Sequence, residues 1–568
     1  MTAVAPVATP VRPLVARSSR PAAVLLAFIV LMAAYAGLSL LNDPRGTLGT
    51  DTGGKLATVV EMDRHGTFDP DVGYWAEDLD PSGHLHPLWY TSHVGNGWVN
   101  VTTLPMVLMA KPLYAAGGAR AVVLLPMLGA AFAALAARAL ARRIAGGDGW
   151  WAFWTVGLAS PIAIYALDFW EHAPGVALAC WGVVCMYDVL EGRAGWRTAL
   201  ASGALFGVAA TMRTEALVYA AVLGVVAAVV LLRRALAGQQ PWLRNVQWGG
   251  AFAFGLIAPL VVNQWIEGVL LGDAIRSDRV AGTASRAAGG SSLRAKEALT
   301  TAVGLNRLPF RSDWVLGAVI VALVAYAAWR LIGSDREVRR FGFVALFAAV
   351  LLYLLCFSDG LGFVPGLLTA SPLAAAGVAI GWSVHRWRPV GAVALLSVPV
   401  VWVFQFTGGA NPQWGGRYLL ITGTLLAVGA AVALPLMPLS GRVAIVGLAV
   451  MVTLMGSLWL SQRSHTVADA MRTLDRHDGS VLVSREAHLL REGGAFYTSD
   501  KRWLTATTDA DLEQAGAIAS AVDAPALRVV GAVGRPIPRT VGHWRRGAAQ
   551  RVEFLPGFDV IVVTYTGG

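Results

Sequence analysis

Charged and polar side chains interrupt this apolar sequence at five short segments whose residue types could form a reaction site. The segments are 50–55 (TDTGGK), 84–87 (HLHP), 168–172 (DFWEH), 213–215 (RTE) and 413–418 (QWGGRY). A carboxylate can accept the proton of an attacking hydroxyl group, and an arginine fork matches the oxygen atoms of a phosphate. The combination favours a transfer reaction in which a hydroxyl attacks and a phosphate leaves.

Residue type and position assign a candidate role to each side chain of these segments. Each role has a structural alternative: an aspartate in a turn, a helix cap, or an Arg213–Glu215 ion pair at the membrane interface. His84, His86 and His93 could also ligate zinc, so a divalent metal stays open and no cofactor is predicted with certainty. The catalytic candidates are Asp51, Glu171 and Asp168; the phosphate-binding candidates are Arg213, Arg417, Tyr418 and Lys55; the acceptor- or sugar-binding candidates are His86, His172, Glu215 and Trp414.

Long apolar runs must position these segments. The chain has 568 residues, of which 56% are hydrophobic and 14% charged, whereas soluble domains are about one quarter charged. Runs long enough to cross a bilayer recur along most of the sequence. We therefore predict an all-α polytopic membrane protein with about thirteen crossings, near residues 22–41, 121–138, 151–167, 173–190, 198–212, 216–232, 248–265, 313–329, 341–357, 367–384, 390–405, 418–437 and 443–461.

Arginine clusters fall in alternate short connections between these crossings, which are cytoplasmic under the positive-inside rule. The net charge of +10 therefore reflects topology and not a nucleic-acid-binding face. This assignment places the N-terminus in the cytoplasm and the C-terminus outside the cell membrane. The clusters are Arg138, Arg142 and Arg143; Arg193 and Arg197; Arg233 and Arg234; Arg330, Arg339 and Arg340; and Arg386 and Arg388.

Three parts are predicted along the chain. Residues 1–21 form a cytoplasmic tail, and residues 22–461 form a transmembrane catalytic domain with a large outer loop over 42–120. Within that loop, residues 101–116 are amphipathic and contain Pro105 and Pro112, which predicts a surface-lying or re-entrant helix. Residues 462–568 are predicted to form a small extracytoplasmic α/β domain, with strands near 480–484, 526–532 and 558–564 and a helix over 510–522.

The order of several motifs resembles the GT-C superfamily of membrane glycosyltransferases, which includes protein O-mannosyltransferases and lipid A aminoarabinose transferases. The motifs are Asp51 in the first outer loop, the His-Pro pair ending at Pro87, and Gly117-Gly118-Ala119-Arg120 before the second crossing. The Gly-Arg-Tyr element at Tyr418 and the outer C-terminal domain also fit. The resemblance implies a sugar donor on a polyprenyl phosphate and inverting transfer on the outer face. The acidic motif is doubled in many members, whereas Thr52-Gly53 follows Asp51 here, so metal dependence stays open.

We therefore predict a bacterial cell-envelope glycosyltransferase in the plasma membrane, with Asp51 as the general base. Its partners would be a polyprenyl-phosphate-linked sugar, a glycan, lipid or protein acceptor, and membrane lipid, but no nucleic acid. Two alternatives remain: a glycan ligase with a lipid-diphosphate donor, and a secondary transporter. A transporter would carry its polar residues on broken helices at mid-membrane, whereas these segments all fall on one side of the predicted topology.

Overall fold

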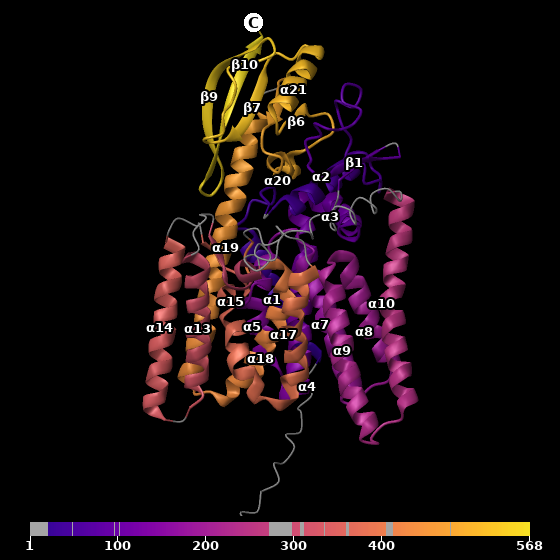
Figure 1. The fold of residues 1–568 in the computed structure, drawn as a ribbon, viewed down its shortest axis with the longest axis vertical. Coiled ribbons are helices and arrows are strands. Elements are labelled where there is room, and N and C mark those ends of the chain that lie inside the picture. Colours follow the sequence, from indigo (N-terminus) through magenta and orange to yellow (C-terminus); the bar gives the residue numbers. More distant parts are fainter. Residues whose placement is uncertain are drawn as a thin grey trace, which may run out of the picture.

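The computed structural model describes residues 21–567, apart from 48, 96, 101–102, 272–297, 307–311, 334, 359–362, 405–412 and 477–478. A layer of roughly parallel and antiparallel helices carries a smaller domain above one of its ends (Figure 1). Ten helices in the described ranges are long and apolar enough to cross a membrane. They correspond to α1 (Pro21–Ser39), α4 (Leu124–Ala145), α7 (His172–Leu190), α9 (Glu215–Leu236), α10 (Trp242–Leu271), α13 (Ser312–Leu331), α14 (Arg336–Ser358), α17 (Arg388–Phe404), α18 (Leu420–Ala433) and α19 (Leu439–Asp475). Two of these spans include adjoining 3₁₀ turns: the span of α17 is His385–Phe404 and that of α18 is Arg417–Leu436.

The remaining three of the thirteen predicted crossings are not among these ten spans. The run 151–167 forms α5 (Trp150–Leu158) and α6 (Ile162–Tyr165), which are separated by Ser160 and Pro161. The run 367–384 forms α15 (Leu367–Ala370), α16 (Pro372–Ile380) and the 3₁₀ turn η1 (Gly381–Ser383), and the run 198–212 forms α8 (Trp196–Met212). Proline has no backbone N–H and disfavours helical geometry in the residue before it. Hydropathy alone therefore did not reveal the breaks within 151–167 and 367–384.

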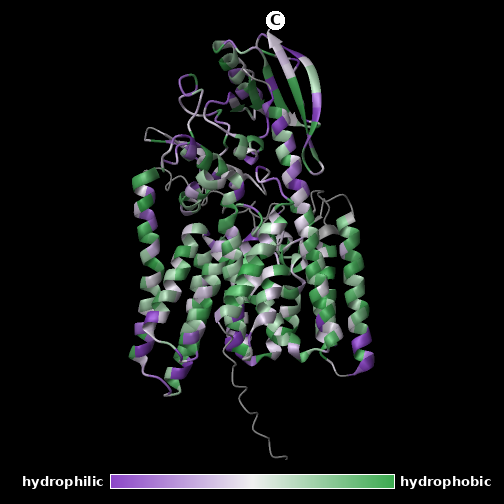
Figure 2. Cartoon of the chain, turned by 180° about the vertical axis from the view of Figure 1, so that it is seen from behind, coloured by the Kyte–Doolittle hydropathy of each residue, from purple (hydrophilic) through white to green (hydrophobic). Residues whose placement is uncertain are grey.

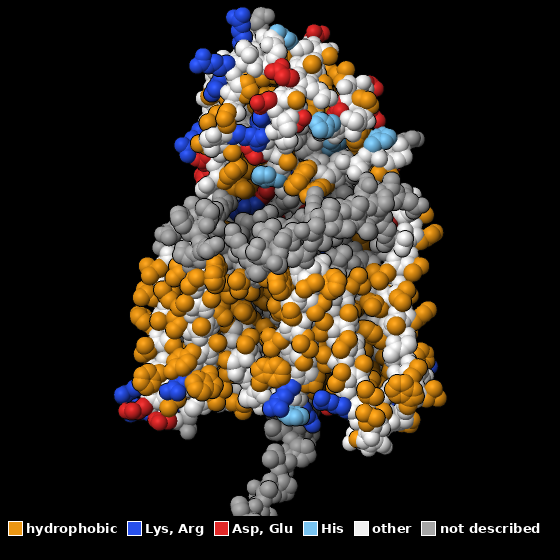
Figure 3. All heavy atoms as spheres, in the orientation of Figure 1, with side chains coloured by type: hydrophobic (Ala, Val, Ile, Leu, Met, Phe, Trp, Pro, Cys, Tyr) orange, Lys and Arg blue, Asp and Glu red, His pale blue; other side chains and the backbone are white. Residues whose placement is uncertain are grey.

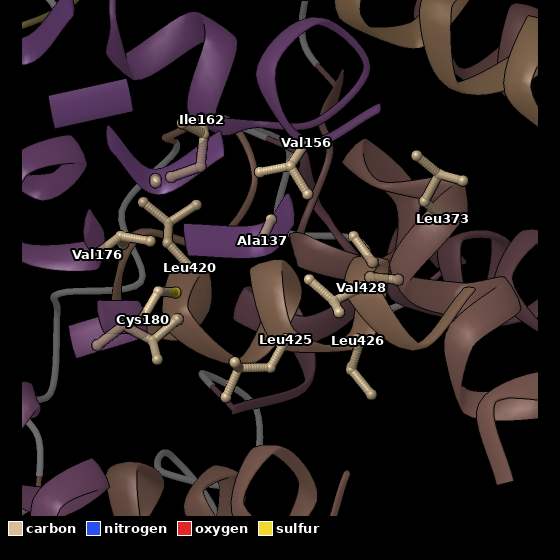
Figure 4. Close-up of a cluster of buried hydrophobic side chains, with 14 of the residues drawn as sticks. Ala137, Val156, Ile162, Val176, Cys180, Leu373, Leu420, Leu425, Leu426 and Val428 are labelled. Atoms are coloured by element: carbon tan, nitrogen blue, oxygen red, sulfur yellow. The ribbon is translucent and has the colours of Figure 1, made fainter. Parts of the chain in front are cut away.

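Helix α18 lies at the centre of the helical layer, and all fourteen of its residues are buried. Figure 4 shows side chains of α4, α5, α6, α7 and α16 packed around it, among them Val156 and Leu373. Glycine allows the backbones to approach closely, because a Cβ atom at Gly377 of α16 would collide with the carbonyl oxygen of Leu426. Small residues at helix contacts are typical of membrane bundles.

The outer surface of this layer is apolar and its ends are charged. Figure 2 shows mostly hydrophobic residues along the helices. Figure 3 shows hydrophobic side chains covering this face of the helical layer, with Lys and Arg gathered at its lower edge. Large exposed side chains include Phe254 and Phe347, each more than two thirds exposed. An apolar belt of this kind fits a hydrocarbon environment, where the backbone polar groups must be satisfied within the protein.

The arginine-rich connections meet at that lower end of the bundle. Arg143, at the end of α4, and Arg193, after α7, both pair with Asp188, at 2.8 and 3.1 Å respectively. The Tyr187 hydroxyl donates to the carbonyl oxygen of Arg386 in the turn η2 (His385–Trp387). The alternation of arginine clusters predicted from the sequence thus corresponds to one end of the molecule.

At the opposite end, residues 42–123 form a cap on the helical layer. It contains α2 (Thr50–Arg64), a hairpin of β1 (Thr91–Val94) and β2 (Gly97–Asn100), and α3 (Leu104–Val122). Helix α3 covers the segment predicted to lie on the surface, and it is kinked at Gly117 and Gly118, the latter with φ of 62°. After the kink, the Arg120 guanidinium donates to the Ser39 carbonyl oxygen at 3.1 Å, at the end of α1. This contact gives the Gly-Gly-x-Arg motif a helix-capping role.

Helix α19 leads directly into the C-terminal domain, because it continues past residue 461 to Asp475 (Figure 1). Its six-stranded sheet has the order β6-β5-β7-β10-β9-β8, with β5 parallel to β6 and β7 and with β10 antiparallel to β7 and β9. The predicted strands and helix correspond to β5, β7, β10 and α21. The elements are β5 (Val481–Ser484), α20 (Leu489–Glu492), η5 (Gly494–Phe496), β6 (Trp503–Thr505), α21 (Asp509–Ala521), β7 (Leu527–Ala532), β8 (Thr540–Val541), β9 (Trp544–Leu555) and β10 (Phe558–Gly567). Elsewhere the chain forms β3 (Leu305–Asn306), β4 (Phe363–Val364), η3 (Arg417–Leu419) and η4 (Leu434–Leu436).

Candidate active site

Four of the five polar segments meet between the helical layer and the C-terminal domain. Asp51 and Lys55 lie one turn apart at the start of α2, so both face the same side of the helix. Glu171 ends the connection between α6 and α7, and Arg213 lies in the break between α8 and α9. Arg417 opens η3, which leads into α18. Glu171, Arg213 and Arg417 therefore stand at ends of helices of the helical layer, and Asp51 and Lys55 reach them from the cap helix α2.

Glu171 is the centre of a buried ion-pair network. The Lys55 ammonium contacts Glu171 Oε2, and an Arg213 terminal nitrogen lies 3.0 Å from Oε1. Arg213 also pairs through Nε with Glu215, at 2.8 Å. The Glu171 side chain is only 3% exposed. Because a buried charge is costly unless it is paired, this network anchors α2 to the starts of α7 and α9.

Asp51 differs from the other carboxylates of the cluster in being open to solvent, with 38% of its side chain exposed. Arg417 NH1 lies 2.8 Å from its Oδ2, and Arg491 NH1 lies 3.6 Å from its Oδ1. Partial burial raises the pKa of Asp51, but the positive charges of Arg417 and Arg491 lower it by more. The net effect is a pKa well below the usual range, so Asp51 is ionised at neutral pH.

Asp168 has a different environment. Its Oδ2 accepts a hydrogen bond from the Thr52 hydroxyl at 3.1 Å, and the residue is buried. The contact ties the start of α2 to the α6–α7 connection. Asp168 thus lies next to the cluster and contacts Thr52, the residue that follows Asp51 on α2.

Aromatic rings form one wall of the cluster. The Arg417 guanidinium lies 4.8 Å from the centroid of Tyr418 and 5.4 Å from that of Trp170, and Arg213 lies 5.2 Å from Tyr418. These are cation–π distances. The His172 ring packs between Trp170, at 4.4 Å, and Tyr165, at 5.1 Å.

The same wall contains buried polar atoms that are not satisfied by the protein. Within the described part of the chain, neither ring nitrogen of His172 has a hydrogen-bond partner, nor do the Tyr165 hydroxyl and the Trp170 indole nitrogen. Most buried polar side-chain atoms in proteins are paired. These three residues lie near Arg213 and Arg417. Their free polar atoms would form hydrogen bonds with ligand atoms or water at this wall.

Two sequence candidates lie outside the cluster. His86 is in the core under the C-terminal domain, where its ring stacks 5.5 Å from that of Trp98 and its Nε2 lies 3.2 Å from the Gly73 carbonyl oxygen. Burial lowers the pKa of His86 to about 4. Trp414 is fully buried, with its ring 5.6 Å from that of Trp459. Both side chains are buried, and the sugar-binding role expected of them stays a prediction.

No metal site emerges from the residues that the structure describes, because no three His, Cys, Asp or Glu side chains among them lie close enough to hold an ion. The histidines considered as ligands are apart: His84 pairs with Asp511 at 3.0 Å, and His93 lies 3.5 Å from Glu77. The described side chains therefore offer no ligand set for the divalent metal that the sequence left open.

Arg491 was missed by the sequence analysis. It comes from α20 in the C-terminal domain and contacts Asp51 across 440 residues of chain. Its neighbours in sequence (LLREGG) carry no motif. The glycines after Asp51 also have a role that differs from the expected one. A Cβ atom at Gly53 would collide with the Arg491 carbonyl oxygen, so the close approach is made by α20 and not by a substrate.

No protein-family model and no curated protein matches this chain at the level of sequence. Solved structures similar to it include ArnT from Cupriavidus metallidurans in the apo state, at 13% identity and a TM-score of 0.45, covering 96% of this chain and 98% of that chain. The same protein bound to undecaprenyl phosphate matches at 12% identity and a TM-score of 0.35, with the same coverage. The archaeal oligosaccharyltransferase AglB from Archaeoglobus fulgidus, in complex with an inhibitory peptide and a dolichol-phosphate, matches at 11% identity and a TM-score of 0.38, covering 88% of this chain and 69% of that chain. All three matches have sequence identities of 11–13% and TM-scores below 0.5.

Proposed function

We propose that this chain is a membrane glycosyltransferase that moves a sugar from a polyprenyl-phosphate donor to a hydroxyl acceptor on the outer face of the membrane. The observation that carries the proposal is the exposed Asp51 carboxylate, held 2.8 Å from the Arg417 guanidinium at the end of the helical layer. A general base and a phosphate-binding fork thus lie side by side. A lipid headgroup resides at this depth of a bilayer, so a lipid-linked phosphate and a polar acceptor can meet there.

The reaction follows from this arrangement. Asp51 takes the proton of the acceptor hydroxyl while its oxygen attacks the anomeric carbon of the sugar. The bond from that carbon to the phosphate oxygen breaks, and its electron pair leaves with the polyprenyl phosphate. Arg417 and Arg213 stabilise the charge that develops on the phosphate. Attack opposite the leaving group inverts the configuration at the anomeric carbon.

The other candidates take supporting roles in this mechanism. Lys55 and Glu215 hold Glu171 and Arg213 in place through the buried ion pairs. Tyr418 lies against the guanidinium groups of both arginines and completes the phosphate site. The unpaired ring nitrogens of His172 are suited to hydrogen bonds with sugar hydroxyls.

Replacing Asp51 by Asn tests the proposal. The protein would be reconstituted in lipid nanodiscs with a panel of undecaprenyl-phosphate-linked hexoses and pentoses, and released undecaprenyl phosphate would be quantified. Loss of a general base costs roughly a hundredfold to ten-thousandfold in rate, so Asp51→Asn is expected to lose nearly all release while still binding undecaprenyl phosphate.

Asp63→Asn is the matched control, since Asp63 is a partly buried carboxylate near the other end of α2. Its release rate is expected to equal that of the wild type. Retention by Asp51→Asn of more than about a tenth of the wild-type rate, far above the usual cost of losing a general base, would reject Asp51. Glu171→Gln would then be measured.

The same assay separates the two alternative functions. A ligase with a lipid-diphosphate donor would release undecaprenyl diphosphate, whose detection in place of the monophosphate would overturn the proposed donor class. A secondary transporter would release neither. In the described residues the charged cluster lies at one end of the helices, and a transporter site is expected near the bilayer midplane, which favours the enzyme.

A further inference from the structure

The C-terminal domain touches α2 backbone to backbone beside Asp51. A Cβ atom on Gly53 would collide with the Arg491 carbonyl oxygen, and one on Gly494 would collide with the Gly53 carbonyl oxygen. Both glycines are therefore needed for α20 and η5 to lie this close to the start of α2. The two backbones are therefore in direct contact here, with no side chain between them.

Arg491 uses this contact to reach the site. Its side chain is 2% exposed, its Nε donates to Asn100 Oδ1 at 3.2 Å, and its NH1 lies 3.6 Å from Asp51 Oδ1. The guanidinium also lies 5.4 Å from the centroid of the Tyr90 ring. The arginine thus joins the C-terminal domain, the β1–β2 hairpin and α2 at one point.

The segment that carries Arg491 is itself fixed. Glu492 pairs with Arg463 of α19, and the Glu492 carbonyl oxygen accepts a hydrogen bond from the Thr47 hydroxyl at 2.9 Å. Thr47 lies three residues before the start of α2. A buried charge pair and a hydrogen bond therefore hold α20 against both α19 and the segment that leads to Asp51.

We infer that Arg491 is a positioning residue of the active site, through which the C-terminal domain orients the Asp51 carboxylate toward the acceptor. This inference rests on the proposed function of Asp51. Arg417 of the helical layer pairs with Oδ2 of Asp51, and Arg491 of the C-terminal domain lies near Oδ1. With one arginine on each oxygen, the plane of the carboxylate is set by both parts of the molecule, and the C-terminal domain is a component of the site.

The charges around Asp51 make this role measurable. The Asp51 carboxylate feels the positive charges of Arg417, Arg491, Lys55 and Arg213, and the negative charge of Glu171 opposes them. An opposite charge within about 4–6 Å lowers a carboxyl pKa by roughly one to three units. Removing the Arg491 charge should therefore raise the protonated fraction of Asp51 at a given pH by about tenfold or more, since each unit of pKa is a factor of ten.

Carboxyl labelling reads this fraction without any transfer assay, because carbodiimides react with protonated carboxyl groups. Labelling of Asp51 at pH 5 would be measured by peptide mass spectrometry in wild type, Arg491→Gln and Arg491→Lys. We expect at least about a tenfold rise in Arg491→Gln and near wild-type labelling in Arg491→Lys, which keeps the charge. Sugar transfer should fall in Arg491→Gln and be partly rescued by lysine.

Arg64→Gln is the matched control, since Arg64 also joins α2 to the C-terminal domain, through Asp500 at 2.8 Å, but at the far end of the helix. Neither labelling nor transfer should change in it. Asn100→Ala keeps the Arg491 charge but removes the hydrogen bond from Arg491 Nε to Asn100. It should slow transfer without raising Asp51 labelling. This variant replaces Arg491→Gln as the test if Arg491→Gln does not fold. Unchanged labelling in folded Arg491→Gln, or unchanged transfer in Asn100→Ala, would overturn the inference. Shifted labelling together with full activity of Asp51→Asn would instead reject the proposed function.

Discussion

At the scale of single residues, the Arg417–Asp51 pair sets a condition on catalysis. A carboxylate whose pKa is held low by two arginines is a weak base, and proton transfer is most efficient when the pKa of the base is nearer the working pH. A donor phosphate that binds Arg417 would offset part of that positive charge. We therefore expect donor binding to raise the basicity of Asp51, so that the base becomes effective only when the donor is in place.

This coupling predicts two different acid limbs in the pH dependence of transfer. The kcat/KM profile reports the free enzyme, in which the Asp51 pKa is lowered, and kcat reports the donor complex. A lowered pKa keeps Asp51 ionised to lower pH, so kcat should decline at a higher pH than kcat/KM, by about one unit or more. Steady-state kinetics with saturating acceptor, extended to the lowest pH at which the enzyme stays folded, would compare the two limbs. Coincident limbs would show that the donor does not change the charge around Asp51.

At the scale of elements, α2 is the part that the two domains share. Its first two turns carry Asp51 and Lys55, and the glycines between them let α20 pack directly on the helix backbone. The colliding atom at Gly53 belongs to the backbone of Arg491, which cannot swing away as a side chain can. The packing of α20 on α2 therefore also sets the position of Arg491 relative to Asp51.

Replacing Gly53 by Ala should separate these elements. Overpacking costs about 1–3 kcal/mol, and displacement of α20 should also withdraw Arg491 from Asp51. We expect a lower midpoint of thermal unfolding in detergent and at least a tenfold loss of undecaprenyl phosphate release. Gly37→Ala in α1 is the control, since a Cβ atom there meets nothing within 4 Å and alanine favours a helix by about 0.5–1 kcal/mol. Equal stability of the two variants would contradict the packing argument.

At the scale of the whole molecule, the arginine clusters and the Asp51 cluster lie at opposite ends of the helical layer, which gives the protein a direction across the membrane. We propose that the arginine-rich end faces the cytoplasm, which places the C-terminal domain outside the plasma membrane. Residues 1–20 of the predicted cytoplasmic tail (1–21) lie outside the described residues, and Pro21 begins α1. Asp500 in the C-terminal domain and Gln239 between α9 and α10 are both exposed and stand at opposite ends of the molecule.

Single cysteines at these positions test the orientation. In a background with Cys180, Cys185 and Cys356 replaced, Asp500→Cys in sealed right-side-out vesicles should react with a membrane-impermeant maleimide. Gln239→Cys should react only after permeabilisation. The opposite pattern would invert the topology and place the proposed site in the cytoplasm.

The sequence by itself determined the membrane class, the alternate arginine connections and the strands of the C-terminal domain. These depend on hydropathy, charge and periodicity, which are properties of neighbouring residues. Segments 50–55, 168–172 and 213–215 were identifiable because a charged side chain between apolar runs is unusual and costly.

Only the tertiary structure decided which of these side chains meet. The Asp51–Arg417 and Asp51–Arg491 contacts join residues hundreds of positions apart, and no local pattern encodes which helix ends pack together. His86 and Trp414 carry the same residue types as binding groups, yet their neighbours bury them in cores. Side-chain chemistry can be read from a sequence, whereas the pairing of charges depends on how close-packed helices bring distant segments to one place.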